Sequence, residues 1–370
     1  MLLDACCTEG AVIRHSSSNV LPEDFAFVQN LATRNFVGRG ELCRHFEASL
    51  SGRFDRPRAL LTNSGTAALE VSLNALRKIK PKADRVIVSA YVCPAVVSAV
   101  LRESLKPVFV DVMPGSMNLD VRLAADRVDE NTLALVLTNL GGVPDDYEQG
   151  LALGCFVVSD CAQAIGATWN GVDLATLGHL AVTSFGPTKV LTAGVGGALL
   201  TGDEELYDHA KNYATPEWDV DMYKFAGFVS TCGQHFSDLN AGLGLAQLAK
   251  LDTMIDRRRS IAQRYSDLLS TELGVLLPEK PSQARENNFR YYFFSNMAPR
   301  WLALLSQSGV DARGSIAHDM STYFQGLERM ERLAKNVGRV VSLPIYPSMT
   351  DSEVGDVLSA LRRGFAQGLR

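Results

Sequence analysis

The sequence predicts an α/β fold: a large, mostly parallel sheet with helices on both faces, followed by a smaller C-terminal α+β domain. From about residue 59, short apolar runs rich in β-branched residues alternate with segments of helical spacing. These runs are apolar without a break, which is typical of strands buried on both faces. The 370 residues, 46% of them hydrophobic and 21% charged, also provide enough material for a large core.

The elements of the large domain follow from these runs. We expect two helices, at residues 67–79 and 95–103, where apolar residues recur at helical spacing. Strands are expected at residues 59–62, 85–89, 107–111, 133–137, 155–159, 181–184 and 197–201.

The rest of the chain predicts a helical connection and a second domain. Residues 238–269 predict one or two long helices, with Ser237 or Asp238 as the N-cap. The smaller domain is then expected to contain an aromatic strand at 290–296, a helix-to-strand turn from Gly309 onward and an amphipathic helix at 351–363. We therefore expect an N-terminal arm (1–24), a large domain (25–250) and a small domain (251–370).

Composition and charge disfavour several classes of function. The net charge of −5 has the wrong sign for binding nucleic acid or an anionic membrane, and the run Arg257-Arg258-Arg259 is interpreted as a solvated helix face. Seven cysteines without a C-x-x-C pair and six scattered histidines predict neither a disulfide framework nor a metal site. No stretch approaches the roughly 20 apolar residues that span a bilayer, and the N-terminus lacks the pattern of a secretory signal, so a cytoplasmic protein is expected.

The motif Ser64-Gly65-Thr66-Ala67 follows the first strand and opens a helix. The N–H groups and the positive dipole end of a helix N-terminus suit a phosphate, and Gly65 allows close approach of the backbone. The same residue types are also ordinary helix caps, and that alternative stays open for the motif alone.

Two further motifs stand at strand ends. Asp160 ends the strand before Cys161-Ala162-Gln163, at the edge where open α/β sheets bind ligands, although an acid there can also cap a helix. Lys189 lies in the loop after the next strand, where burial would make it a nucleophile; a solvated surface lysine is the alternative. A phosphate-type helix start, an acid and a lysine 29 residues later (189 − 160) form the set that pyridoxal phosphate chemistry requires.

With this set in place, the chain resembles the DegT/StrS-like sugar aminotransferases, which are pyridoxal phosphate enzymes of fold type I. The resemblance implies a homodimer that moves an amino group, from L-glutamate, to a keto sugar that is linked to a nucleotide. It covers nearly the whole chain, through residues 36–40, 64–69, 106–112, 160–167, 184–189, 242–248 and 342–347.

The resemblance also implies roles for individual residues. Lys189 matches the lysine that forms a Schiff base with the cofactor and moves protons, and Asp160 matches the acid that keeps the pyridine nitrogen protonated. Gln163 matches a residue that contacts the cofactor ring or its phenolic oxygen. The remaining matches are phosphate ligands, at Gly65, Thr66, Ala67 and Ser184, and the ring-stacking position, at Cys93.

Several residues depart from the family pattern. Cys93 stands where many members have an aromatic residue, and Tyr91 is an alternative partner for the ring. Gly186 and Val195 replace a bulkier residue and an acid, and residues 214–229 also diverge. Gln234 or His235 is the candidate to replace an asparagine that neighbouring subunits often supply to the phosphate.

Three other functions compete with this interpretation. Sugar dehydration is disfavoured because the family's dehydratases replace the lysine with histidine, whereas this chain has Lys189. A regulatory protein on the same scaffold is disfavoured by the complete set of matched residues. A nucleotide-binding protein built around residues 194–197 is disfavoured because the G-x-G-x-x-G spacing is absent there.

Overall fold

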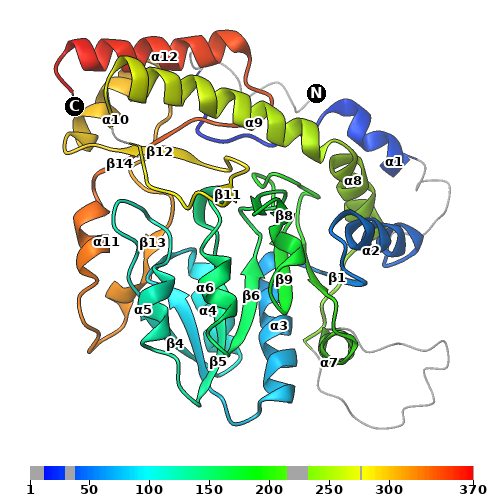
Figure 1. Cartoon of the computed structure of the whole chain (residues 1–370). Coiled ribbons are helices and arrows are strands. Elements are labelled where there is room, and N and C mark those ends of the chain that lie inside the picture. The colour runs from blue at the N-terminus through cyan, green and yellow to red at the C-terminus, as the bar shows by residue number, and fades with distance from the viewer. Residues whose placement is uncertain (1–11, 30–37, 215–231, 276, 370) are drawn as a thin grey trace, which may run out of the picture.

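A computed structural model describes residues 12–29, 38–214, 232–275 and 277–369, and places a seven-stranded sheet at the centre (Figure 1). Residues 36 and 37 of the first family motif and 215–229 of the divergent segment lie outside the described residues. All seven predicted strands are confirmed, with bounds that differ by at most one residue. In sheet order they are β1 (Arg58–Thr62), β10 (Gly197–Thr201), β9 (Leu180–Ser184), β6 (Phe156–Asp160), β5 (Thr132–Leu137), β2 (Arg85–Ser89) and β4 (Lys106–Val110).

Strand β10 is the exception to the parallel pattern, because it pairs antiparallel with both β9 and β1. The other neighbours, from β9 to β4, pair in parallel. Residues 185–196 join β9 to β10 without a helix, and a connection of this kind returns the chain in the opposite direction. As a result, the loop that contains Lys189 lies at the same edge of the sheet as the C-terminal ends of β1 and β6.

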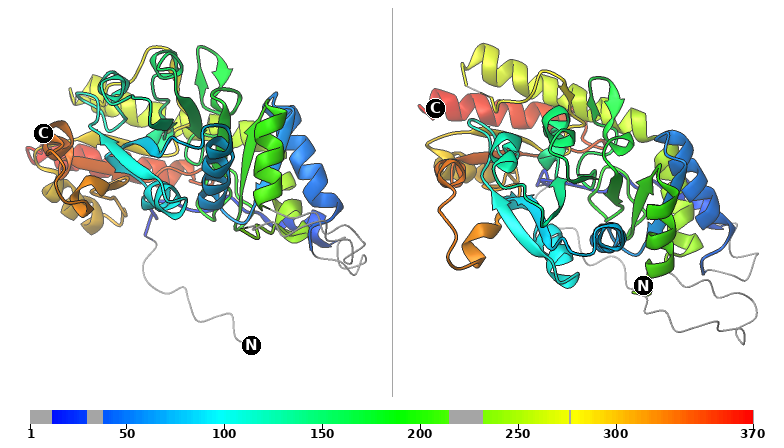
Figure 2. Two further views of the ribbon diagram at one scale, coloured as in Figure 1. Left: turned by 90° about the horizontal axis from the view of Figure 1, so that it is seen from below. Right: turned by 60° about the horizontal axis from the view of Figure 1, so that its bottom comes forward.

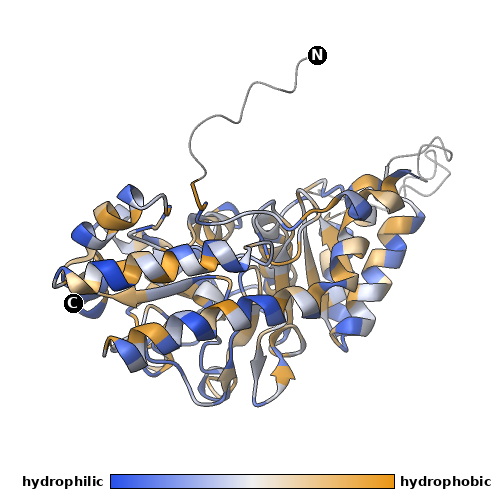
Figure 3. Ribbon diagram, turned by 90° about the horizontal axis from the view of Figure 1, so that it is seen from above, coloured by the Kyte–Doolittle hydropathy of each residue, from blue (hydrophilic) through white to orange (hydrophobic). Residues whose placement is uncertain are grey.

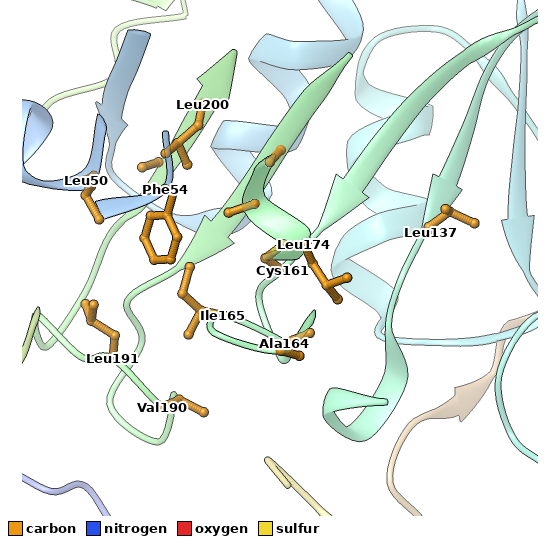
Figure 4. Close-up of a cluster of buried hydrophobic side chains, with 14 of the residues drawn as sticks. Leu50, Phe54, Leu137, Cys161, Ala164, Ile165, Leu174, Val190, Leu191 and Leu200 are labelled. Atoms are coloured by element: carbon orange, nitrogen blue, oxygen red, sulfur yellow. The ribbon is translucent and has the colours of Figure 1, made fainter. Parts of the chain in front are cut away.

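Helices cover both faces of the sheet, and successive strand residues enter different cores. In β5, Leu135 and Leu137 belong to one core, whereas Ala134 and Val136 belong to the other. The first core includes α2 (Glu41–Arg53) and α8 (Asp238–Ala249), and Figure 4 shows part of it, with Phe54 and Ile165 among its side chains. Against the second core pack α3 (Gly65–Ile79), α4 (Pro94–Arg102) and α7 (Glu204–Ala214).

The C-terminal part has a third core. Residues 238–269, predicted as one or two long helices, form two, α8 and α9 (Leu251–Ser266), and a π-helical turn at Asp267–Glu272 follows α9. Figure 3 shows hydrophobic and hydrophilic residues interspersed along α9 and α12 (Asp351–Ala366), as expected for helices with one buried face. The core also contains residues of α10 (Ala298–Gln307) and of the antiparallel pair β12 (Tyr291–Phe294) and β14 (Val340–Leu343).

One prediction for α9 is wrong. The run of three arginines was expected on a solvated face, yet Arg258 is only 2% exposed. Its guanidinium donates to the carbonyl oxygen of Ile345 at 2.8 Å, and to those of Asn288 and Phe289 at 3.4 Å. The arginine therefore links α9 to the segment before β12 from inside the protein.

Short elements complete the fold. Figure 2 shows α2 (blue) and α11 (orange) at opposite ends of the molecule.

Among the described residues, no helix has the length and apolar character needed to cross a bilayer. The three-part division at residues 24 and 250 stays a prediction. The short elements are α1 (Ala26–Gln29), α5 (Val121–Ala125), α6 (Tyr147–Leu151), α11 (Glu331–Asn336), β3 (Tyr91–Val92), β7 (Thr168–Trp169), β8 (Val172–Asp173), β11 (Ala284–Arg285), β13 (His318–Asp319) and the 3-10 turns Pro22–Phe25, Leu140–Gly142, Leu174–Thr176 and Met320–Tyr323.

Candidate active site

A cavity of about 200 Å³ opens at the C-terminal edge of β1, β5, β6 and β9. Both predicted catalytic residues, Asp160 and Lys189, lie on its wall. Five of the other predicted cofactor ligands lie there too: Gly65, Thr66, Cys93, Gln163 and Ser184. The sheet topology explains this, because each of these residues follows a strand or opens a helix at that edge.

The first residues of α3 form one end of the cavity. Ser64 caps the helix, and its Oγ accepts a hydrogen bond from the N–H of Ala67 at 3.1 Å. A Cβ added to Gly65 would lie 2.7 Å from the Cβ of Ser184, so no larger residue fits there without movement. A helix N-terminus with serine and threonine side chains beside it is suited to an anionic group.

Asp160 is the last residue of β6 and is 8% exposed. Its Oδ1 accepts one hydrogen bond, from the N–H of Ala162 at 2.9 Å. Burial raises the pKa of this carboxyl to about 6, although the bond from Ala162 and the charge of Lys189 act in the opposite direction. Such a carboxylate gains most from a cationic or N–H partner on a bound molecule.

Lys189 enters the cavity from the loop between β9 and β10. In the part of the chain that the structure describes, its ammonium group makes no hydrogen bond and no ion pair, and its Nζ lies 5.3 Å from the ring centroid of Phe289. Burial lowers the pKa of Lys189; the charges of Asp160 and Cys93 oppose this effect, and that of Arg290 adds to it. A lysine with a lowered pKa is a better nucleophile, since more of it is neutral near pH 7.

Gln163 is held in place by the loop that follows β5. Its Oε1 accepts a hydrogen bond from the N–H of Gly141 at 2.8 Å, and its main-chain oxygen accepts one from Nδ2 of Asn287 at 3.1 Å. The second bond links this wall of the cavity to a segment more than 120 residues later in the chain.

Two residues with predicted or alternative roles lie away from the cavity wall. Ala67 is buried, and its N–H is already used by the cap of α3. Tyr91 does not reach the wall, because its hydroxyl accepts hydrogen bonds from the N–H groups of Ile316 and Ala317 at 3.1 and 3.2 Å. The structure thus leaves the exposed Cys93, not Tyr91, at the position proposed to face the cofactor ring.

Gln234 and His235, the two candidates to bind the cofactor phosphate of a neighbouring subunit, differ in their exposure. Gln234 is buried, with its Nε2 donating to the carbonyl oxygen of Cys232 at 3.3 Å, whereas His235 is exposed. Neither is on the wall of this cavity. Their role toward a second chain stays a prediction.

Sequence reasoning missed other residues of the site. Thr138 and Leu140 are on the wall, and both follow β5, so the rule that placed Asp160 at the end of its strand applied to them as well. Val92 and Val96 add apolar surface. Phe289, beneath Lys189, belongs to no motif, and nothing in the sequence pattern marked it.

These residues fit the cofactor that the sequence predicts. The glycine at position 65 keeps the helix start open to a phosphate, and Ser184 lies against it. A buried acid that accepts one hydrogen bond within the described part of the chain suits a protonated pyridine nitrogen, and Lys189 faces the same cavity. Pyridoxal phosphate presents all three complementary groups: a phosphate, a ring nitrogen and an aldehyde.

Comparisons with known proteins agree with this fit. A model of the DegT/DnrJ/EryC1/StrS aminotransferase family matches residues 20–362. The chain is 28% identical, over 92% of its length and 94% of the other, to dTDP-4-dehydro-2,3,6-trideoxy-D-glucose 4-aminotransferase of Saccharopolyspora spinosa.

Solved structures show the same architecture. Sugar aminotransferase CalS13 from Micromonospora echinospora superposes with a TM-score of 0.88 at 24% identity, over 95% of this chain and 100% of that one. The PLP form of the putative sugar aminotransferase Spr1654 from Streptococcus pneumoniae gives 0.85 at 20% identity, over 97% and 100%. The predicted fold type I architecture is confirmed.

Proposed function

The chain belongs to the DegT/DnrJ/EryC1/StrS aminotransferase family, and on that premise we propose that it transfers the amino group of L-glutamate to a keto sugar carried on a nucleotide. It is a pyridoxal phosphate-dependent aminotransferase. The observation that supports the proposal most strongly is the meeting of Lys189, Asp160 and the start of α3 in one cavity. Relatives with 28%, 26% and 28% identity are named for aminotransfer to dTDP-linked sugars, for GDP-perosamine synthesis and for aminotransfer to UDP-linked sugars.

In this proposal each residue has a separate task. Pyridoxal phosphate, when bound, supplies an electron sink for the charge left as a proton leaves the substrate carbon. Asp160 holds a proton on the ring nitrogen, since its carboxylate is buried and forms no ion pair with any described residue. Thr66, Ser184 and the N-terminus of α3 bind the phosphate. Lys189 anchors the cofactor and, once released, moves the proton at the substrate carbon.

A homodimer is part of the proposal. Two apolar side chains are exposed, Val195 at 59% in the loop that contains Lys189 and Leu239 at 42% in α8. They belong to neighbouring segments, because Nδ2 of Asn240 donates to the carbonyl oxygen of Ala193 at 2.8 Å. A second chain that covers this surface would bury both side chains, and sedimentation at micromolar concentration tests the expected dimer.

A cytoplasmic location also belongs to the proposal, and fractionation of cells that express the protein tests it.

Absorbance spectroscopy tests the reaction. The protein loaded with pyridoxal phosphate should show the band of a lysine-linked cofactor, and L-glutamate should remove that band. Lys189→Ala should fold normally but show neither the band nor turnover, while Lys106→Ala, which changes an exposed lysine, should behave as the wild type. Normal turnover by Lys189→Ala would contradict the assignment. A band that no amino acid removes would instead favour a different pyridoxal phosphate reaction on the same scaffold.

A further inference from the structure

Arg290 brings a second positive charge close to Lys189. Its Cζ lies 4.3 Å from the ring centroid of Phe289, and Nζ of Lys189 lies 5.3 Å from the same centroid. The two charges are therefore at most about 10 Å apart, the sum of these distances. Arg290 is half-buried, and among the described residues its guanidinium has no carboxylate partner and donates no hydrogen bond.

The backbone at Arg290 is fixed to segments that neighbour the cavity wall at Leu140 and Gln163, although Arg290 itself lines a second cavity. Its N–H donates to the carbonyl oxygen of Gly141 at 2.9 Å. Asn287, three residues earlier, donates from Nδ2 to the carbonyl oxygens of Gln163 and Ile165 at 3.1 and 2.9 Å. The arginine thus stands in a defined position beside the loops that hold Gln163.

Among the described residues no carboxylate forms an ion pair with Arg290, although Glu279 and Glu286 line a second cavity with it, and Glu286 is paired with Lys280. Arg258 and Arg313 are cations, and the carboxylate of Asp311 is 2.7 Å from Arg313. His15, another neighbour, is neutral near pH 7, because burial and the charge of Arg290 lower its pKa to about 3. Burial and the charge of Arg313 lower the pKa of Arg290 itself to about 10. A half-buried cation among other cations is unfavourable unless a ligand brings a negative charge.

We propose that Arg290 binds a carboxylate of the amino donor. This inference rests on the proposed function, in which an amino acid delivers its nitrogen at Lys189. The carboxylates of an amino acid lie within a few bonds of its nitrogen, and the guanidinium fork matches a carboxylate in a bidentate pair. The position near Lys189 therefore gives Arg290 a role in choosing the donor, separate from the residues assigned to the cofactor.

Three variants test the inference in the cofactor-loaded enzyme. Arg290→Met keeps an aliphatic stem over Phe289 but removes the charge, and Arg290→Lys keeps the charge but removes the fork. Arg313→Met is the matched control, because it removes a neighbouring positive charge that is 60% exposed and already paired with Asp311. The measurements are the L-glutamate concentration that half-saturates loss of the lysine-linked band, and the dissociation constant of glutarate, a dicarboxylate that has no amino group.

Arg290→Met should raise both constants roughly 10- to 100-fold, which is the size expected for loss of a charge-assisted bidentate pair, and Arg290→Lys should fall between it and the wild type. The lysine-linked band and the thermal midpoint should stay as in the wild type. Arg313→Met should change both constants less than about threefold, as expected for a screened exposed charge. L-glutamine as donor then locates the contact: an equal loss with both donors indicates the α-carboxylate, and a loss with glutamate alone indicates the side-chain carboxylate.

Other results would overturn the inference. Equal effects of Arg290→Met and Arg313→Met would show that the positive charges attract the donor only at long range and that Arg290 makes no specific contact with it. A normal donor constant combined with a raised KM for the nucleotide-linked acceptor would assign Arg290 to a phosphate. If no amino acid converts the wild-type cofactor, the proposed function fails and the inference fails with it, whereas normal conversion by both the wild type and Arg290→Met refutes the inference alone.

Discussion

Replacing Asp160 with asparagine should stabilise the cofactor-free protein at neutral and alkaline pH. Burial raises the pKa of Asp160 from 3.8 to about 6, so the native state binds this proton more tightly than the unfolded chain does. The native state therefore loses stability as the pH rises from about 4 to about 6, and the loss stays complete above that range. At about 1.4 kcal/mol per pH unit, the raised pKa corresponds to about 3 kcal/mol of unfolding free energy.

Asparagine keeps the oxygen that accepts from the N–H of Ala162 but has no charge to bury. Urea unfolding of the cofactor-free wild type and Asp160→Asn should show a difference that grows by about 3 kcal/mol between pH 4 and pH 8. The same variant, loaded with cofactor, should lose most of its transamination rate, since it no longer holds the proton on the ring nitrogen. A difference in unfolding free energy that is the same at pH 4 and pH 8 would refute the reasoning.

Asp173→Asn is the matched control for this experiment. Oδ1 of Asp173 also accepts from the N–H two residues later, in Ala175, at 2.9 Å, and burial also raises its pKa to about 6. The stability of Asp173→Asn relative to the wild type should therefore also increase as the pH rises. It should leave the cofactor band and the rate unchanged, because Asp173 is not on the cavity wall.

Three further predictions follow from the packing. Gly65→Ala would place a Cβ 2.7 Å from that of Ser184 and should weaken cofactor binding roughly tenfold in an absorbance titration, whereas Gly52→Ala, with no heavy atom within 4 Å, should leave it unchanged. Cys93 is exposed at the cavity, so alkylation of its thiol, followed by peptide mass mapping, should slow when the cofactor is bound; equal rates would place the thiol outside the covered surface. Arg258→Met should lower the unfolding free energy by about 2–4 kcal/mol in urea, since it leaves three buried main-chain carbonyls without their donor, and an unchanged midpoint would contradict this.

The strands of the large sheet were predictable because each is an apolar run bounded by polar or turn residues. Their directions were not, since an apolar run has the same pattern whichever way it is paired. The direction of β10 depends on residues 185–196, which turn the chain back without a helix. The burial of Arg258 was predictable from spacing, because Leu251, Ile255 and Ala262 lie on the same face of α9. The prediction was wrong because arginine is usually exposed, and the residue type was given more weight than the position of Arg258 on the helix.

In the candidate site, too, some residues could be located from the sequence and others could not. Residues at the ends of strands, such as Asp160 and the loop lysine Lys189, could be located from sequence because the sheet edge gathers them whatever their separation along the chain. Tyr91 could not be assigned, because the two N–H groups that hold its hydroxyl come from residues 316 and 317. Spacing along one strand describes which side chains share a face, but not which distant segment covers that face.

The position of Arg290 shows what the segment before β12, distant in sequence from the sheet edge, adds to the site. The sheet edge supplies an acid, a lysine and a helix start for the cofactor, and Lys189 is the one basic residue among the described residues of the cavity wall. Asn287 joins the two parts, because its side chain reaches the carbonyl oxygens of Gln163 and Ile165 and so sets where the chain enters β12. Cofactor binding and donor binding are thus assigned to segments more than 100 residues apart. Changes before β12 can therefore alter the preferred donor while the sheet edge, and with it the cofactor chemistry, stays the same.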